Sequence, residues 1–491
     1  GYINDRETQS PYAIELARRG YVVVALDQSG HGNSDPPAFA AGFGGPDGLA
    51  YLRSLPMVDP DRIVLSGHSM GGWAALIAAG AMPDAYASIV VSGSSTGTFG
   101  APEGTPDWPR NLGLVYAEYD EFSELMWGAP TGATAPATEK MRTLFGSDDP
   151  VEPGRLYGDL EEGTARWLAQ PSVTHPGNHI TVAGVAPVID WVQRTVDAPT
   201  PIPPGDQIWP YKEIGTGLGL LGLFLMFFAA GGLWLRAPAF APLRAAPAPA
   251  GGASGIGWWL AALITVAVPI VTYFPFQNAA PDWIPVGPWF PQQISNGIVV
   301  WAVGNAAIAL VLFLLWFLVA GRKAGLAGVG LRGGVLRSLG LAIATIGSGY
   351  LLLLLTNLVF GTDFRAWVLA ARPLDTVRAG TMMAYLPLFA AFFVVLALVL
   401  HGQLRTSGSE GDRGNVVVNG VLMGAGFASL LLLQYVPLLS GRPLPFGEPL
   451  LTIVAFQFLV LLPVAGMLST YLFRKTGRIW PGGGGGGGGG G

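Results

Sequence analysis

The sequence predicts an α/β domain built on a parallel sheet, followed by an all-helical membrane bundle. Apolar strand-like runs alternate with helical patterns up to about residue 197, an arrangement that is typical of parallel sheets. A glycine-bracketed turn around Ser69 joins one of these runs to a helix. Seven long apolar stretches then occupy most of residues 213–480, and each is long enough to cross a bilayer at about 20 residues.

Charge divides the chain at the same place. Up to Glu213 there are 12 basic and 26 acidic residues, a balance of −14, and beyond it 15 basic and 6 acidic residues, a balance of +9. The overall acidity and the lack of a basic stripe argue against nucleic acid as a partner. The chain has no cysteine, which excludes disulfides and thiolate metal sites.

In the first domain we expect helices over residues 8–20 and 48–55. The run at 21–26 is β-branched and apolar, which is typical of a strand buried on both faces of a sheet. Further strands are predicted in the run that leads into Ser69 and at residues 87–91, 112–116 and 166–169.

Ser69 lies in the run GHSMGG at residues 67–72, which follows a strand and begins a helix. This is the G-x-S-x-G pattern of a nucleophile elbow. A serine hydroxyl is a weak nucleophile, and the sharp turn holds it out of the sheet, beside a base and an oxyanion hole. Side chains at Gly67 and Gly71 would clash in such a turn. The backbone N–H of Met70, directly after the nucleophile, is the expected oxyanion donor.

An acid is expected after the strand at 112–116, because parallel sheets build their sites at the carboxyl ends of strands. The strand runs into AEYDE at residues 117–121. We choose Asp120 as the acid of a catalytic triad, with Glu118 and Glu121 as alternatives.

The first domain contains four histidines. His31 and His68 precede the acid, whereas an elbow serine expects its partners in the order Ser, Asp, His. His175 follows the strand at 166–169 and precedes the next helix, so it is the expected base. His179 lies four residues further on and stays open as the alternative base.

Three motifs carry a family resemblance: Gly1-Tyr2 before a helix, Asp27 with GHGNS at 30–34, and GHSMGG at 67–72. With these motifs, residues 1–197 resemble the α/β-hydrolase superfamily, and within it the dienelactone hydrolase and polyester-hydrolase (cutinase-like) group. The resemblance implies that the N–H of Tyr2 is a second oxyanion donor beside that of Met70. It also implies hydrolysis of carboxylic esters, without a metal or organic cofactor, on a small acyl ester or lipid-like substrate.

Members of this superfamily place two or more strands before the Gly-Tyr turn, and one of them lies between the 21–26 strand and the elbow strand. The sequence starts at Gly1, and these strands are absent from it. We therefore expect an N-terminally truncated α/β-hydrolase sheet with its first strands missing. The predicted domains are residues 1–197, a Pro-rich linker at 198–212, a transmembrane domain at 213–480, and a glycine tail at 481–491 that is foreign to the fold.

Seven spans are predicted in the second part, which makes the chain an integral membrane protein with the lipid bilayer as a partner. The spans cover residues 214–235, 256–276, 294–320, 338–360, 381–401, 415–439 and 450–473.

The basic residues of the loops predict an orientation. The loops after the odd-numbered spans and the final tail carry eleven Lys or Arg, including Arg322, Lys323 and Arg332, and the other loops carry four. The richer side is expected to be cytoplasmic. The hydrolase-like domain then lies outside the cytoplasm, with the bacterial plasma membrane as the expected location. Trp209, Tyr211 and Lys212 are expected to anchor the first span at the membrane interface.

Two functions of different classes follow from the sequence. The first is a membrane-anchored serine hydrolase that cleaves carboxylic esters; a peptidase would use the same triad. The second is a membrane transport or sensing protein whose hydrolase-like domain binds a ligand without turning it over. The complete Ser, Asp, His order favours the enzyme.

Overall fold

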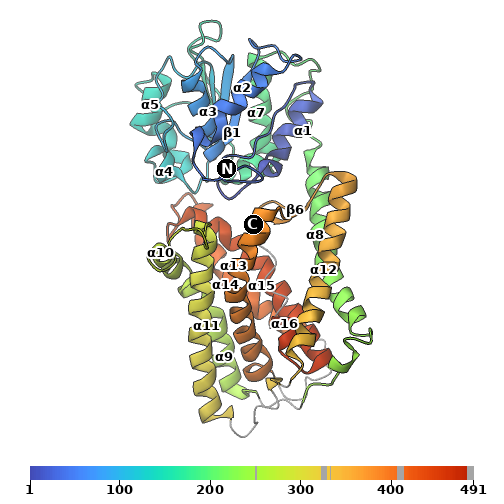
Figure 1. Ribbon diagram of the computed structural model, residues 1–491. Helices are drawn as coiled ribbons and strands as arrows, with labels where there is room; N and C mark the ends of the chain where they lie inside the picture. The colour runs from blue at the N-terminus through green and yellow to red at the C-terminus, as the bar shows by residue number, and fades with distance from the viewer. Residues whose placement is uncertain (249–251, 322–328, 332, 406–413, 484–491) are drawn as a thin grey trace. The chain divides into compact units, whose positions relative to one another are not determined.

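The computed structural model describes residues 1–248, 252–321, 329–331, 333–405 and 414–483. These residues form two compact units (Figure 1). The first comprises Gly1–Ile214 together with Gln434–Pro449, and the second comprises Gly215–Leu433 and Leu450–Gly491. The loop residues Arg322, Lys323 and Arg332 and most of the glycine tail lie outside the described residues.

The first unit is built on a five-stranded sheet with the order β1-β2-β3-β5-β4. Four neighbouring strands are parallel, and only β4 runs antiparallel to its neighbour. The strands are β1 (Val64–His68), β2 (Ser88–Ser92), β3 (Leu112–Val115), β4 (Leu156–Tyr157) and β5 (Arg166–Ala169). The predicted strands at 87–91, 112–116 and 166–169 are therefore present, whereas the short β4 escaped prediction.

Helices cover both faces of this sheet (Figure 1). On one face, α3 (Met70–Ala81) packs against Ile89, Val91 and Leu114 in the larger apolar core. On the other face, α1 (Ser10–Arg18) and α7 (Val182–Thr195) pack against Val90 and Val115. Successive strand residues point to opposite faces. The strands are apolar on both sides because both sides are covered.

Smaller elements complete the unit. The predicted helix at 48–55 is α2 (Gly45–Ser54), and η1 (Arg6–Gln9) precedes α1. The remaining segments are η2 (Ala41–Gly44), α4 (Ser123–Trp127), η3 (Gly132–Ala137), α5 (Glu139–Phe145) and α6 (Gly177–Ile180).

The strand predicted at 21–26 is wrong. This segment belongs to no strand, and Val22 and Leu26 are exposed. The sheet begins at β1, which pairs with β2 on one side, and none of the described residues forms a strand beyond it. An apolar run becomes a strand only when a neighbour accepts its backbone hydrogen bonds. Residues 21–26 have no such neighbour in the described part of the chain.

The Pro-rich segment is held against α1 by hydrogen bonds to two residues that form a buried ion pair, Glu15 and Arg19. The Arg19 guanidinium lies 2.7 Å from the Glu15 carboxylate, and both side chains are fully buried. Arg19 also donates to the carbonyls of Ile202 and Pro203, while Glu15 accepts the N–H of Trp209. The segment predicted as an extended linker is thus tied to the first unit.

Trp209, one of the three predicted anchor residues, is buried. Its side chain is 5% exposed and packs in the apolar cluster that contains Tyr12 and Val185. Trp209 thus belongs to the core of the first unit, whereas Tyr211 of the predicted anchor is exposed, and the anchor at the membrane interface stays a prediction.

The second unit is helical, and the described part of the chain has six helices long and apolar enough to cross a membrane. A seventh candidate is a bent pair, α9 (Gly255–Val271) and α10 (Tyr273–Trp283), with 52° between its axes. The six helices cover Trp209–Trp234 (α8), Gln293–Val319 (α11), Val335–Phe360 (α12), Thr376–Gln403 (α13 with the π-helical η7), Asn415–Leu438 (within α14) and Pro449–Thr476 (α15).

The bend in the second predicted span has a sequence cause. Pro275 has no N–H with which to reach the carbonyl of Val271, so the helix breaks where α9 ends. A hydropathy pattern registers the apolar length and is insensitive to this loss of one hydrogen bond. Smaller elements of this unit are η4 (Ala241–Leu243), the hairpin β6 (Phe364–Ala366) with β7 (Leu369–Ala371), and α16 (Trp480–Gly483).

The buried Arg19–Glu15 pair gives a stability prediction. Arg19→Met leaves the buried Glu15 carboxylate with Arg18, 3.4 Å away, as its ionic partner, so we expect the free energy of local opening around α1 to fall by at most about 3–5 kcal/mol. Hydrogen–deuterium exchange of the amides in α1 and in residues 202–209 measures this change. Arg155→Met, which removes an exposed pair with Glu152, is the control and should leave exchange unchanged. Equal protection in both variants would contradict the role given to Arg19.

Candidate active site

Ser69 sits on a strained turn between β1 and α3. Its φ and ψ are 55° and −123°, in a region that side-chain-bearing residues seldom adopt. The turn is fixed at both ends, because the Ser69 N–H donates to the Ser92 carbonyl at 2.8 Å and the Gly72 N–H donates to the Ser69 carbonyl at 2.8 Å. This is the geometry that the GHSMGG run predicts.

Gly67 and Gly72 make the turn possible, whereas the clash predicted at Gly71 is wrong, because a Cβ there would have no neighbour nearer than 3.9 Å. A Cβ at Gly67 would lie 2.0 Å from the carbonyl oxygen of Gly71, and a Cβ at Gly72 would lie 2.4 Å from the Ser94 hydroxyl. Both distances are too short for any carbon contact. The strand and the helix can therefore meet at this angle only when neither position carries a side chain.

The loops after β3 and β5 bring Asp120 and His175 together. These strands are neighbours, and their pairing continues past their ends through the Tyr119 N–H, which donates to the Val173 carbonyl at 3.0 Å. At the end of this extension the Nδ1 atom of His175 lies 2.8 Å from an Asp120 carboxylate oxygen. Both side chains are buried.

The charge of Asp120 controls the protonation of His175. Burial by itself would lower the pKa of His175, but the attraction and hydrogen bond of Asp120 outweigh it and raise the pKa above its usual value of 6.5. The Nδ1–H that points to the carboxylate leaves Nε2 as the atom that can take up a proton in the neutral ring.

Two contacts place this ring beside the elbow. A Cβ at Gly93, directly after Ser92, would lie 3.0 Å from the Cε1 and Nδ1 atoms of His175. The ring of His68, the neighbour of Ser69, has its centroid 4.6 Å from that of His175. The described contacts do not include a hydrogen bond between the Ser69 hydroxyl and His175. Such bonds are often long before substrate binds.

His68 and His179 form a second layer behind this ring. Their rings stack with centroids 4.3 Å apart, and Gln9 Nε2 lies 3.2 Å from Nδ1 of His179. Burial lowers the pKa of His179 to about 3 and holds the pKa of His68 well below 6.5. Both rings are therefore neutral at ordinary pH, and His175 is the ring that contacts the carboxylate of Asp120.

The two alternative acids have other partners. Glu118 accepts a hydrogen bond from the Ser172 hydroxyl at 2.5 Å. Glu121 accepts the backbone N–H of His175 at 2.6 Å, and burial, followed by the nearby charge of Asp120, raises the pKa of Glu121 to about 7. Of the three carboxylates, Asp120 meets the ring and Glu121 holds the backbone of the same histidine.

The two expected oxyanion donors are the backbone N–H groups of Met70 and Tyr2. Met70 is the first residue of α3, where free backbone N–H groups and the helix dipole favour a negative charge. The Tyr2 ring contacts His31 and Phe39, at 5.6 and 5.7 Å between centroids. The donor role of the Tyr2 N–H stays a prediction. Among the described residues, no group of three or more His, Asp or Glu side chains is arranged to hold a metal ion.

Comparison with protein families gives one match. Residues 2–124 match the family model described as the alpha/beta hydrolase fold, and this range includes β1, the Ser69 turn and α3. This part of the chain has an alpha/beta hydrolase fold. The matched range contains Ser69 and Asp120 of this hydrolase fold and ends before His175. Comparisons with curated proteins and with solved structures found no match.

Sequence reasoning missed Gly93 and Gln9, which shape the hydrolase-fold site, and it named Glu121 only as an alternative acid. Gly93 makes room for the His175 ring, Gln9 contacts His179, and Glu121 fixes the His175 backbone. Only Glu121 carried a signal, because it adjoins the predicted acid. Gln9 is 170 residues from its partner, and no local pattern connects the two.

Asp120→Asn tests the cause of the raised pKa. Without the carboxylate, burial dominates, and we expect the pKa of His175 to fall from above 6.5 to below it. Histidine titration by ¹⁵N NMR measures this shift, since the chain has only five histidines. Glu118→Gln removes a nearby carboxylate that does not contact the ring and is the control. A His175 pKa that does not move in Asp120→Asn would contradict the assigned cause.

Proposed function

We propose that this protein is a membrane-anchored serine hydrolase that cleaves carboxylic esters through Ser69, His175 and Asp120. The alpha/beta hydrolase fold supports a hydrolase. The observation that carries the finer proposal is the 2.8 Å contact between His175 and Asp120 beside a serine on a strained elbow. The dienelactone and cutinase-like resemblance favours esters over peptides as substrates.

In the proposed reaction His175 acts as the base. Its Nε2 atom removes the Ser69 proton while the serine oxygen attacks the acyl carbon of the ester. Asp120 orients the ring and stabilises the imidazolium that forms. The imidazolium then gives its proton to the departing alcohol, and a water activated by the same histidine releases the acid from the acyl-enzyme.

The developing oxyanion would be met by the Met70 N–H, with the Tyr2 N–H as the second donor. Each such donor contributes about 3–4 kcal/mol to lowering the barrier. The positive φ of Ser69 supports this assignment, because an elbow turn presents its hydroxyl and the following N–H to the same side.

The proposed anchor is the set of six long apolar helices, or seven when the bent pair is counted as one span. Their length and composition suit a bilayer of about 30 Å. We also propose the orientation that the loop charges favour, with the hydrolase-fold unit outside the cytoplasm, in a bacterial plasma membrane. Cysteine substitutions in the described loops, labelled from one side of sealed vesicles, distinguish the two orientations.

A second candidate is a transport or sensing protein in which the hydrolase-fold unit binds a ligand without cleaving it. The set of apolar helices is what favours this alternative, since it is larger than an anchor requires. Absence of turnover in well-folded protein would support it.

The nucleophile and the base are tested together with a fluorophosphonate probe and a panel of p-nitrophenyl esters on the full chain. Ser69→Ala should abolish labelling, and His175→Ala should reduce ester turnover by on the order of 10³-fold or more. His179→Ala is the matched control and should retain most of the turnover. Loss of activity in His179→Ala with retention in His175→Ala would reverse the assignment of the base.

The pH dependence follows from the raised pKa of His175. The base must be neutral to accept the serine proton, so kcat/KM should fall as the pH drops through the His175 pKa. Because Asp120 raises that pKa, the midpoint of the acid limb should lie above pH 6.5. A pH–rate profile with its acid limb well below 6.5 would contradict His175 as the proposed base.

A further inference from the structure

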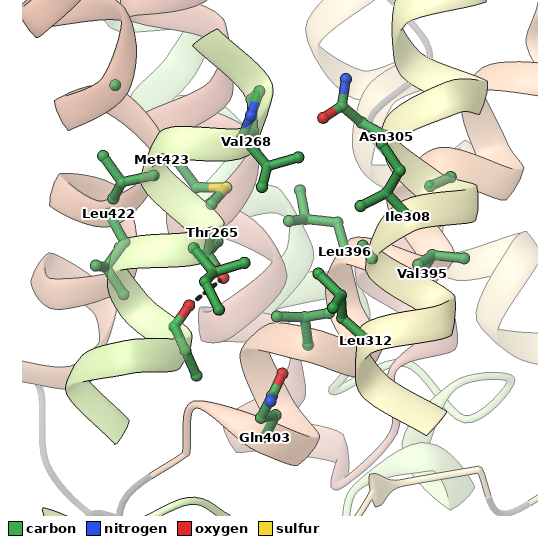
Figure 2. A pocket seen from close by; sticks show the side chains of 18 of the residues that line it. Thr265, Val268, Asn305, Ile308, Leu312, Val395, Leu396, Gln403, Leu422 and Met423 are labelled. Carbon is green, nitrogen blue, oxygen red and sulfur yellow. Dashed lines mark hydrogen bonds between the residues drawn. The ribbon is translucent and has the colours of Figure 1, made fainter. Parts of the chain in front are cut away.

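The second unit contains a cavity of about 290 Å³ between four helices (Figure 2). It is lined by α9, α11, the end of α13 with η7 (Val399–Gln403), and α14 (Gly414–Leu438), with Leu462 of α15 at its edge. Figure 2 shows Val268, Leu312, Leu396 and Met423 around the same space.

The lining selects an apolar occupant. Among the described residues, no Asp, Glu, Lys, Arg or His lines the cavity. Its inner polar groups are already engaged: the Thr265 hydroxyl donates to the Ala261 carbonyl, and the Asn305 amide donates to the Trp301 carbonyl, both at 2.8 Å. A charged or strongly hydrated ligand would lose its water here and gain no partner in return.

The shape suits a chain better than a compact ring system. The α9 wall runs from Gly257 to Ile270, which is about 20 Å of helix at 1.5 Å per residue. A cavity of 150 Å³ holds benzene, so about twice that volume has room for roughly a dozen carbon atoms. The flexible side chain of Met423 in the wall adapts to the contour of such a chain.

Two features point to entry from the bilayer. Leu260 and Ile264 line the cavity and are yet 55% and 41% exposed, so the wall formed by α9 also faces the outside of the helices. At the other end of the cavity from Asn305, Gln403 lies in the π-helical η7 (Figure 2). Departures from α-helical geometry of this kind are frequent at functional sites.

Gln403 gives this end a polar side chain, whereas the polar groups of Thr265 and Asn305 elsewhere in the wall bond to the backbone of their own helices. The Gln403 amide is half-buried, and the hydrogen bonds of the described residues include none to its side chain. A carboxamide can both donate and accept, which suits the ester group where an acyl chain joins a lipid headgroup.

We infer that this cavity is a binding site for one acyl chain of a bilayer phospholipid, with the ester end of the chain at Gln403. The site takes its ligand sideways from the membrane. The inference is independent of the proposed ester hydrolysis and holds whether or not Ser69 is a nucleophile.

Photolabelling of the full chain in detergent tests the site. The probe is a phosphatidylcholine with a diazirine in the middle of one long acyl chain, and labelled peptides are mapped by mass spectrometry. We expect saturable labelling in α9, α11 and α14. An unlabelled long-chain phosphatidylcholine should compete, whereas dibutyryl phosphatidylcholine, which has the same headgroup, should not.

Two alanines on α11 provide matched variants. Ala309 lines the cavity, whereas Ala307 is exposed and lies outside its lining. Ala309→Phe fills the cavity and should lower the saturable labelling at least about fivefold, since overfilling a packed site is unfavourable. Ala307→Phe adds the same ring on the same helix and should leave labelling unchanged.

Several outcomes would overturn the inference. One is labelling of the unaltered chain that never saturates, and another is labelling that spreads evenly over its exposed helix faces. Both outcomes are measured without the variants, so they do not depend on whether the variants fold. Others are equal labelling in the two phenylalanine variants, and stronger competition by cholesteryl hemisuccinate than by long-chain phosphatidylcholine. Competition by palmitic acid alone would assign the cavity to free fatty acid and would equally overturn it.

Discussion

The close approach of β1 and α3 at Ser69 is the constraint on which the candidate site depends. With Gly67 and Gly72 lacking side chains, the strand and the helix meet so tightly that the serine between them must take a positive φ. The strain is held in place by the packing of α3 in the larger core and by the bond from the Ser69 N–H to β2. The parallel order of the sheet then puts Asp120 and His175 at the same edge.

Three buried histidine rings at this edge have different electrostatic environments. The carboxylates of Asp120 and Glu121 both face His175, so the raised pKa belongs to His175 while burial keeps His68 and His179 neutral. A neutral stacked pair can pack closely against a ring that becomes charged without adding a like charge beside it. The arrangement thus lets a single imidazole change its protonation state inside a buried cluster.

The sequence predicted what depends on local patterns. The elbow, four of the five strands and the long apolar helices follow from periodicity, glycine spacing and length. The strand prediction at 21–26 failed. The segment has the composition of a strand, but a strand forms only beside a neighbouring strand that accepts its backbone hydrogen bonds. The burial of Trp209 and the contact of Gln9 with His179 arise from residues distant in the chain, and no local pattern encodes them.

Asp120 and Glu121 are consecutive residues that grip the same histidine at different points. One carboxylate binds the ring of His175 and the other binds its main-chain N–H, while the bridge between Tyr119 and Thr174 lies just before them. A slip of one position between the two loops would break both attachments at once. The alignment of the loops is therefore specified twice, and the imidazole is carried on a continuation of the sheet instead of on a mobile flap.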